Sequence, residues 1–101
     1  MSVLHITDAT FEQEVLRSEK PVLLDFFAGW CAPCGRQAPI LDKLAAAHPE
    51  LKVAKIDVDA SPALARRHKV ISIPTLVVYK NGEITAQAKG LQSEDALLNM
   101  I

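Results

Sequence analysis

The sequence predicts an α/β fold in which helices cover both faces of a mixed central β-sheet. Three observations lead to this class: an apolar run at Val22–Phe27 that suits a strand buried on both faces, amphipathic segments at helical spacing, and a hairpin signal at Asn81-Gly82. The expected order is β-α-β-α-β-α-β-β-α, with parallel crossovers first and antiparallel pairing at the hairpin. At 101 residues, the chain is expected to form a single domain, residues 1–101.

A strand, a helix and a second strand are expected in the first 27 residues. Val3–Ile6 is a short strand candidate. The segment Thr10-Phe11-Glu12-Gln13 matches a capping box, in which a threonine side chain accepts a hydrogen bond from the first helical turn. We therefore expect a helix from Thr10 to Lys20-Pro21. Val22–Phe27 then forms the central strand, in which Asp25 is the only charged residue.

A long helix is expected after the central strand. It begins at the cysteines, shows apolar residues at helical spacing and ends at Pro49. Because proline lacks an amide hydrogen and clashes with the preceding turn, Pro39 is expected to kink this helix or to divide it. The next strand is expected at Val53–Val58, where apolar residues alternate with Lys55 and Asp57.

The last third of the chain is expected to add a short helix, a hairpin and a final helix. Ser61-Pro62 has the pattern of a helix start, and that helix is expected to end near Lys69. Strands at residues 76–79 and 84–88 flank Asn81-Gly82, a dipeptide typical of two-residue hairpin turns. Ser93 is expected to cap the last amphipathic helix.

The basic residues near position 68 are expected to serve the structure alone. Arg66, Arg67 and Lys69 have the pattern of a solvated helix face. His68 is expected to be a cation at the end of a helix, where the dipole favours positive charge.

Composition excludes several classes of function. The chain has 11 Lys and Arg against 12 Asp and Glu, a net charge of −1, so no basic excess is present to neutralise nucleic-acid phosphates. The first residues lack the features of a signal peptide, and the longest apolar stretch is too short to cross a bilayer. We therefore expect a soluble, cytoplasmic monomer with neither nucleic-acid nor membrane partners.

The two cysteines form the motif Cys31-Ala32-Pro33-Cys34. A disulfide across two residues closes a very small loop and restricts the unfolded chain little, so the pair would add little to the stability of the fold. A zinc site would need two more ligands, and the sequence has neither a second CxxC nor a paired histidine motif. No metal is expected. Half a zinc site and an inert bridge remain as minor alternatives to a redox pair.

The expected position of Cys31 suits a reactive thiol. The predicted topology puts it at the start of a helix and at the carboxyl end of a central strand, where ligand sites of open α/β sheets gather. Unpaired N–H groups and the helix dipole favour a thiolate there and lower the pKa of the thiol. Cys34 follows one turn later. These positions predict that Cys31 is the exposed nucleophile and Cys34 the buried resolving thiol.

The segment from Asp25 to Cys34, which reads DFFAGWCAPC, resembles the active-site segment of the thioredoxin family, usually written with WCGPC at its centre. Further similarities occur at Ala38–Leu41, Val53–Asp57, Ser72–Leu76, Lys80–Gly82 and Gly90. The resemblance implies a thioredoxin fold and a protein-disulfide reductase that acts by dithiol–disulfide exchange in cell redox homeostasis. It implies no bound cofactor; the reducing equivalents come from NADPH through a flavoenzyme, thioredoxin reductase. The other partners it implies are client proteins that contain disulfides.

The resemblance also implies roles for individual residues. Asp25 falls on the family's buried carboxylate; burial should raise its pKa and suit it to accept the proton of Cys34, directly or through a water. Lys55 falls on the family's lysine near this carboxylate and is expected to moderate the shift. Pro74 falls on the family's cis-proline. The residues expected to contact clients are Trp30, Ala32, Pro33, Ile73, Pro74 and Gly90.

Structural roles remain open for several of these residues. Asp25 and Lys55 can form a purely structural pair, Trp30 can be a packing residue, and Gly90 can be an ordinary turn glycine. Two other functions also remain open: an oxidase or isomerase on the same fold, and a binding module without turnover.

Four residues depart from the family pattern. Ala32 replaces a glycine, Gly35 stands where lysine is common, Phe27 stands where tryptophan is frequent, and Lys89 stands beside Gly90 where the family is often apolar. We expect Ala32 and Gly35 to influence the reduction potential and Lys89 to influence the choice of partner.

Overall fold

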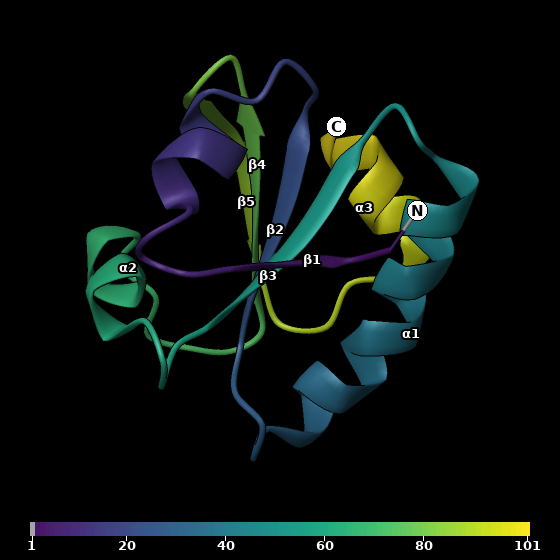
Figure 1. Cartoon of the computed structure of the whole chain (residues 1–101). Helices are drawn as coiled ribbons and strands as arrows, with labels where there is room; N and C mark the ends of the chain where they lie inside the picture. Colours follow the sequence, from purple (N-terminus) through teal and green to yellow (C-terminus); the bar gives the residue numbers. More distant parts are fainter. Residues whose placement is uncertain (1) are drawn as a thin grey trace.

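The computed structural model describes residues 2–101, and five strands form one mixed sheet with helices on both faces (Figure 1). The strands are β1 (Leu4–Ile6), β2 (Val22–Phe27), β3 (Lys52–Asp57), β4 (Thr75–Lys80) and β5 (Glu83–Lys89), and the helices are η1 (Glu12–Leu16), α1 (Ala32–Ala47), α2 (Pro62–Arg67) and α3 (Glu94–Met100). Across the sheet the strand order is β1-β3-β2-β4-β5. The first three strands run parallel, β4 runs antiparallel to β2, and β5 antiparallel to β4. The predicted class and order of elements are confirmed.

Two apolar layers hold the helices against the sheet. Side chains alternate along β2, so Leu24 and Phe26 face η1 and α2, whereas Leu23 faces α1 and α3. Each of these three side chains is at most 1% exposed, and burying each contributes roughly 1.5–3 kcal/mol. Figure 1 shows the same division, with η1 and α2 on one side of the sheet and α1 and α3 on the other.

The hairpin between β4 and β5 follows the prediction. Asn81 and Gly82 have φ angles of 53° and 79°, and a two-residue turn of type I′ requires positive φ at both positions. A β-carbon at Gly82 would lie 3.0 Å from the Leu16 carbonyl oxygen, so the turn also packs closely against the end of η1. The strands extend beyond the predicted residues at both ends.

The predicted capping box at Thr10 is wrong. The Thr10 hydroxyl oxygen accepts a hydrogen bond from the Thr7 N–H at 3.0 Å, so the side chain points back along the chain. The helix that follows is one wide turn, in which the Arg17 N–H donates to the Glu12 carbonyl five residues earlier at 3.0 Å. Local hydrogen bonding therefore competes with the helix and shortens it to Glu12–Leu16.

The long helix α1 is continuous, and Pro39 does not divide it. Pro39 and the residue four positions earlier, Gly35, are both exposed. Water can therefore satisfy the Gly35 carbonyl, which loses its helical donor at a proline. Among residues 2–101, no helix combines the length and apolar character needed to span a membrane.

His68 is buried, and the prediction of a helix-end cation is wrong. Its Nδ1 lies 2.8 Å from the Leu64 carbonyl oxygen and therefore donates, so Nε2 accepts from the Tyr79 hydroxyl at 2.7 Å. The rings of Phe11 and Phe26 pack against the imidazole at 5.4 and 4.8 Å. Burial lowers the pKa of His68 and keeps the ring neutral. α2 itself ends at Arg67, and the Ser61 hydroxyl does not cap it.

Candidate functional site

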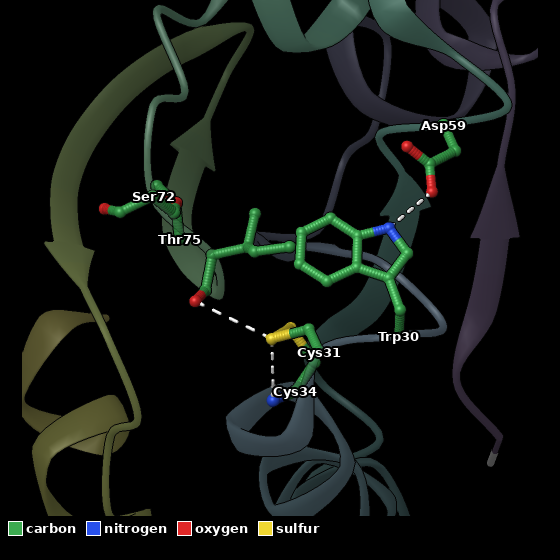
Figure 2. The surroundings of a disulfide bond; sticks show 7 residues. Trp30, Cys31, Cys34, Asp59, Ser72 and Thr75 are labelled. Atoms are coloured by element: carbon green, nitrogen blue, oxygen red, sulfur yellow. Dashed lines mark hydrogen bonds between the residues drawn. A yellow bond between two sulfur atoms is a disulfide. The ribbon is translucent and has the colours of Figure 1, made fainter.

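A disulfide joins Cys31 and Cys34 at the start of α1, with their Cα atoms 5.3 Å apart (Figure 2). The loop after β2 turns at Ala28, whose carbonyl accepts from the Cys31 N–H at 3.2 Å. Cys31 is the N-cap of α1, and its Sγ accepts from the Cys34 N–H at 3.2 Å. Pro33 lies in the first turn, where the missing amide hydrogen costs nothing. The predicted position of the motif is confirmed.

Both cysteines are buried, which corrects the prediction of an exposed Cys31. The exposed fractions are 8% for Cys31 and 4% for Cys34. Phe27, Val58 and Ile73 pack against the pair, and the Cys31 Sγ lies 3.7 Å from the Ile73 carbonyl oxygen. Between the cysteines, Ala32 is exposed and Pro33 is partly exposed. The two residues that separate the sulfurs therefore form an accessible rim beside the buried disulfide.

The loop before β4 closes one side of the site. The Ile73–Pro74 peptide bond is cis, as the family resemblance implies. The Gly90 N–H donates to the Pro74 carbonyl at 2.8 Å, and Gly90 has a φ of 83°, which favours glycine. A β-carbon at Gly90 would meet no heavy atom within 4 Å, so backbone conformation rather than crowding explains this glycine. Ile73 therefore lies beside the disulfide, and Pro74 and Gly90 are joined to it through the cis peptide bond and this hydrogen bond.

Trp30 covers the opposite side of the site. Its side chain is 74% exposed, which contradicts the alternative of a packing residue. The indole Nε1–H donates to the Asp59 carboxylate at 2.9 Å, and Figure 2 shows the ring held between the disulfide and Asp59. Sequence reasoning missed Asp59, because 29 residues separate it from Trp30 and no local pattern marks it.

Gln37 is a second residue that sequence reasoning missed. It is 0% exposed in α1, and its amide forms two hydrogen bonds with the backbone of Gln92: Nε2 donates to the carbonyl at 3.0 Å, and Oε1 accepts from the N–H at 2.8 Å. The Gln92 side chain in turn donates to the Gly90 carbonyl at 3.2 Å. The one signal that the sequence offered for this role was a glutamine among the apolar residues on the inner face of α1. It fixes the segment that carries Gly90 against the helix that carries the cysteines.

Asp25 is buried in β2. It is 0% exposed, and neither carboxylate oxygen has a partner in residues 2–101. Burial raises the pKa of Asp25 to about 7, and the nearby positive charge of Lys55 opposes this rise. Both directions agree with the predictions. Lys55 pairs with Asp25 in the parallel register, and its Nζ lies 4.7 Å from the ring centroid of Phe27, which packs against the cysteines.

Comparison with known proteins agrees with this geometry. The thioredoxin family model matches residues 2–101. The chain belongs to the thioredoxin family. It is 45% identical to thioredoxin from Mycobacterium bovis over 98 residues, which cover 96% of this chain and 84% of that protein. It is 45% identical to thioredoxin from Streptomyces clavuligerus, with coverage of 93% and 88%.

A third relative has a longer architecture. The bifunctional thioredoxin reductase/thioredoxin of Mycobacterium leprae is 44% identical over 96 residues, which cover 94% of this chain and 21% of that protein. Thioredoxins are thiol–disulfide oxidoreductases, so dithiol–disulfide exchange is the activity of this chain. The Cys31–Cys34 disulfide is the redox pair for that chemistry.

The departures from the usual thioredoxin motif lie on the surface. The methyl group of Ala32 is exposed on the rim of the site. Gly35 is exposed as well, and a β-carbon there would meet no heavy atom within 4 Å, so packing does not require a glycine. Both positions can therefore change without disturbing the core.

Proposed function

We propose that the chain is a general protein-disulfide reductase in which Cys31 attacks the client disulfide and Cys34 resolves the intermediate. One observation carries this assignment: the Cys31 Sγ lies at the N-terminus of a 16-residue helix and accepts the Cys34 N–H at 3.2 Å. The same N–H and the helix dipole stabilise negative charge on Cys31 once the disulfide is reduced. Cys31 is also the more exposed of the two, by 8% to 4%.

The reaction proceeds in two exchange steps. The Cys31 thiolate attacks one client sulfur, the client S–S bond breaks, and the other client sulfur leaves as a thiolate that takes up a proton. Cys34 then loses its proton and attacks Cys31. The Cys31–Cys34 disulfide forms, and the second client sulfur leaves and is protonated. Two electrons pass from the protein to the client. Because Cys31 starts as a thiolate, Cys34 releases one proton and the solvent supplies the other.

Asp25 is proposed as the proton acceptor for Cys34, directly or through a water. The carboxyl group has no competing hydrogen bond in residues 2–101, and its pKa of about 7 lies in the range where a base works near neutral pH. Lys55 prevents a further rise of that pKa by its charge. In this proposal Lys55 acts through Asp25 and is a positioning residue.

The client is proposed to bind as an extended segment across the rim of the site. The exposed ring of Trp30 offers apolar contact on one side, and the Ile73 backbone offers hydrogen-bonding groups on the other. The residues of this client surface are Trp30, Ala32, Pro33, Ile73, Pro74 and Gly90.

The reducing equivalents are proposed to come from NADPH through a separate flavoenzyme, thioredoxin reductase, with no cofactor bound to this chain. The Mycobacterium leprae relative supports this, because its name joins a thioredoxin reductase and a thioredoxin in one protein. We further propose that the protein acts as a monomer in the cytoplasm on disulfide-containing clients.

The equilibrium reduction potential of the cysteine pair tests the direction of electron flow. The protein is equilibrated in graded thiol–disulfide buffers, quenched with a mass-tagging alkylator, and analysed for free thiols. A value at or below the cytosolic glutathione potential of about −220 to −260 mV supports a reductase. A markedly more oxidising value supports the oxidase or isomerase alternative, and the Ala32→Gly variant then shows whether Ala32 is the cause.

Two cysteine variants test the assigned roles. The Cys34→Ser variant should accumulate a mixed disulfide with an oxidised client, whereas the Cys31→Ser variant should not. The reverse pattern would exchange the two roles. Full biological activity of the doubly substituted Cys31→Ser/Cys34→Ser protein would instead support a binding module without turnover.

A further inference from the structure

A cationic cavity lies beside the proposed client surface, on the face of the sheet that carries α2. Its volume is about 580 Å³, within the range of about 300–1,000 Å³ that is typical of ligand sites. The end of α2, the start of β4 and the edge strand β5 line it, and its lining includes Arg67, Lys69, Thr75 and Lys89. The lining includes three side chains that carry a permanent positive charge and no carboxylate, although the chain as a whole has a net charge of −1.

Among the residues that the structure describes, none forms an ion pair with the three cations of this cavity. The ion pairs found in residues 2–101 involve Arg17, Lys43, His48 and Lys52, and none of these lines the cavity. The Arg67 guanidinium lies 5.0 Å from the ring centroid of Phe11, which is a cation–π contact and not an ion pair. Arg66, Arg67 and Lys69 are exposed, as predicted, and Arg67 and Lys69 also line this cavity. Unpaired positive charge around a concave surface favours an anionic ligand.

Lys69 holds an unfavourable backbone conformation at this cavity. Its φ is 56°, at the position after α2 where helices commonly end in glycine. The Val70 N–H donates to the Ala65 carbonyl at 3.0 Å, as in the usual glycine-terminated ending. A lysine in this conformation costs roughly 1 kcal/mol relative to glycine. Glycine would suit this backbone conformation better, so the fold itself does not account for a lysine at position 69. The positive charge that Lys69 places at the cavity is then the feature that needs an explanation.

The cavity continues the proposed client surface. Thr75 follows Pro74 directly, and Lys89 pairs with Thr75 across β4 and β5 and precedes Gly90. The Gly90 N–H donates to the Pro74 carbonyl, so the cavity and the client surface share one backbone connection. An extended chain advances about 3.3 Å per residue, so a client segment at Ile73 and Pro74 brings its next residues to the cavity.

We propose that this cavity binds an acidic side chain of the client, close in sequence to the cysteine that Cys31 attacks. The proposal rests on the proposed function and adds a substrate class to it: disulfides flanked by aspartate or glutamate. The carboxylate accepts hydrogen bonds from Lys69, Lys89 and Arg67, and electrostatic attraction also accelerates encounter.

Two disulfide peptides of equal length, one with Glu and one with Gln two residues after the attacked cysteine, test the preference. The reduced protein should reduce the Glu peptide about fivefold faster at low ionic strength, and high salt should remove the difference. The Lys69→Gly and Lys89→Gln variants should lose the preference and keep the rate for the Gln peptide. Lys69→Gly should also raise the free energy of unfolding. The control, Lys80→Gln, removes one charge at the other end of β4 and should keep the preference.

Binding is measured separately from reduction, by amide chemical shifts with serine-substituted versions of both peptides. Shifts at residues 67–69 and 87–89 with the Glu peptide alone, lost in Lys69→Gly, support the site even if neither disulfide peptide is reduced. Failure to reduce either peptide contradicts the proposed function. Equal rates for both peptides, or shifts caused by inorganic phosphate alone, overturn the acidic-client proposal.

Discussion

The Asp25 carboxylate lies opposite Lys55 in the parallel register of β2 and β3, and yet neither of its oxygens accepts a hydrogen bond in residues 2–101. A buried carboxyl group in this state is more stable when protonated. The resulting pKa of about 7, against 3.8 for an ordinary aspartate, has consequences both for stability and for the proposed proton transfer.

Stability should fall as the pH rises through the window that Asp25 defines. Because the folded-state pKa is raised, the folded protein binds more protons than the unfolded chain between about pH 4 and pH 7. The contribution of Asp25 to the free energy of unfolding is therefore fully present below pH 4 and is lost above pH 7. The loss is about 4 kcal/mol. Urea unfolding at several pH values should show that Asp25→Asn no longer loses this stability as the pH rises, whereas Asp42→Asn, a control at an exposed site, still loses it. Parallel pH profiles for Asp25→Asn and the parent protein would contradict the assignment.

Lys55→Gln should raise the pKa of Asp25 above about 7. The positive charge of Lys55 opposes the effect of burial, and its removal leaves burial alone. The measurement is a pH titration of the Asp25 carboxyl carbon by NMR, with Lys80→Gln as a control of equal charge change. If Cys34 resolves a mixed disulfide with the help of Asp25, the pH profile of the resolution rate should also move to higher pH. An unchanged midpoint would mean that the two side chains do not interact.

Tyr79→Phe should destabilise the protein by about 1–3 kcal/mol at pH 7.5, because it leaves the Nε2 of buried His68 without a hydrogen-bond donor. The pKa of His68 is lowered by burial, so its contribution to stability is present above pH 6.5 and is lost as the pH falls through and below that value. Denaturant unfolding of both proteins at several pH values measures the effect. Equal stability at pH 7.5 would show that the hydroxyl contributes nothing.

Gln37→Leu should loosen the segment that carries Gly90. The substitution keeps a side chain of similar size and removes both hydrogen bonds to the Gln92 backbone, at a cost of about 2–3 kcal/mol. Amide hydrogen exchange at Gly90 and Gln92 should become faster, while exchange in β2 should change only through global stability. Unaltered local exchange would show that other contacts hold the segment.

Asp59→Ala should release the indole of Trp30. The hydrogen bond at 2.9 Å is the polar contact that the structure shows for this exposed ring, and surface interactions of this kind contribute up to about 1 kcal/mol. Trp30 is the sole tryptophan, so fluorescence anisotropy reports its mobility directly. Anisotropy should fall in the variant, with a change of less than about 1 kcal/mol in the free energy of unfolding. Unchanged anisotropy would indicate that packing positions the ring.

The sequence was sufficient for features determined by local patterns. The apolar run of β2, the Asn81-Gly82 turn and the Ser93 cap at α3 are each specified by neighbouring residues, and the structure confirms all three. The errors have a common cause in tertiary contacts. The partner of Asp59 lies 29 residues away in sequence, and Gln37 bonds across 55 residues.

Burial was also difficult to infer from a one-dimensional pattern. His68 follows a helical segment with two arginines, which suggests solvent, but Phe11 and Phe26 enclose it from distant elements. Cys31 stands at a helix start that is typical of accessible residues, and Phe27, Val58 and Ile73 cover it. Both results depend on which elements meet, and that information resides in the sheet topology.

The disulfide closes a ring of only four residues within the first turn of one helix. No strand crossing, interlayer contact or loop closure depends on it, since the two apolar layers lie elsewhere. We therefore expect both oxidation states to share one scaffold and nearly the same outer shape. Under the proposed function, a reductase and a client meet that shared shape in opposite oxidation states, so their dissociation after each transfer should depend on the charge and reactivity of two sulfur atoms.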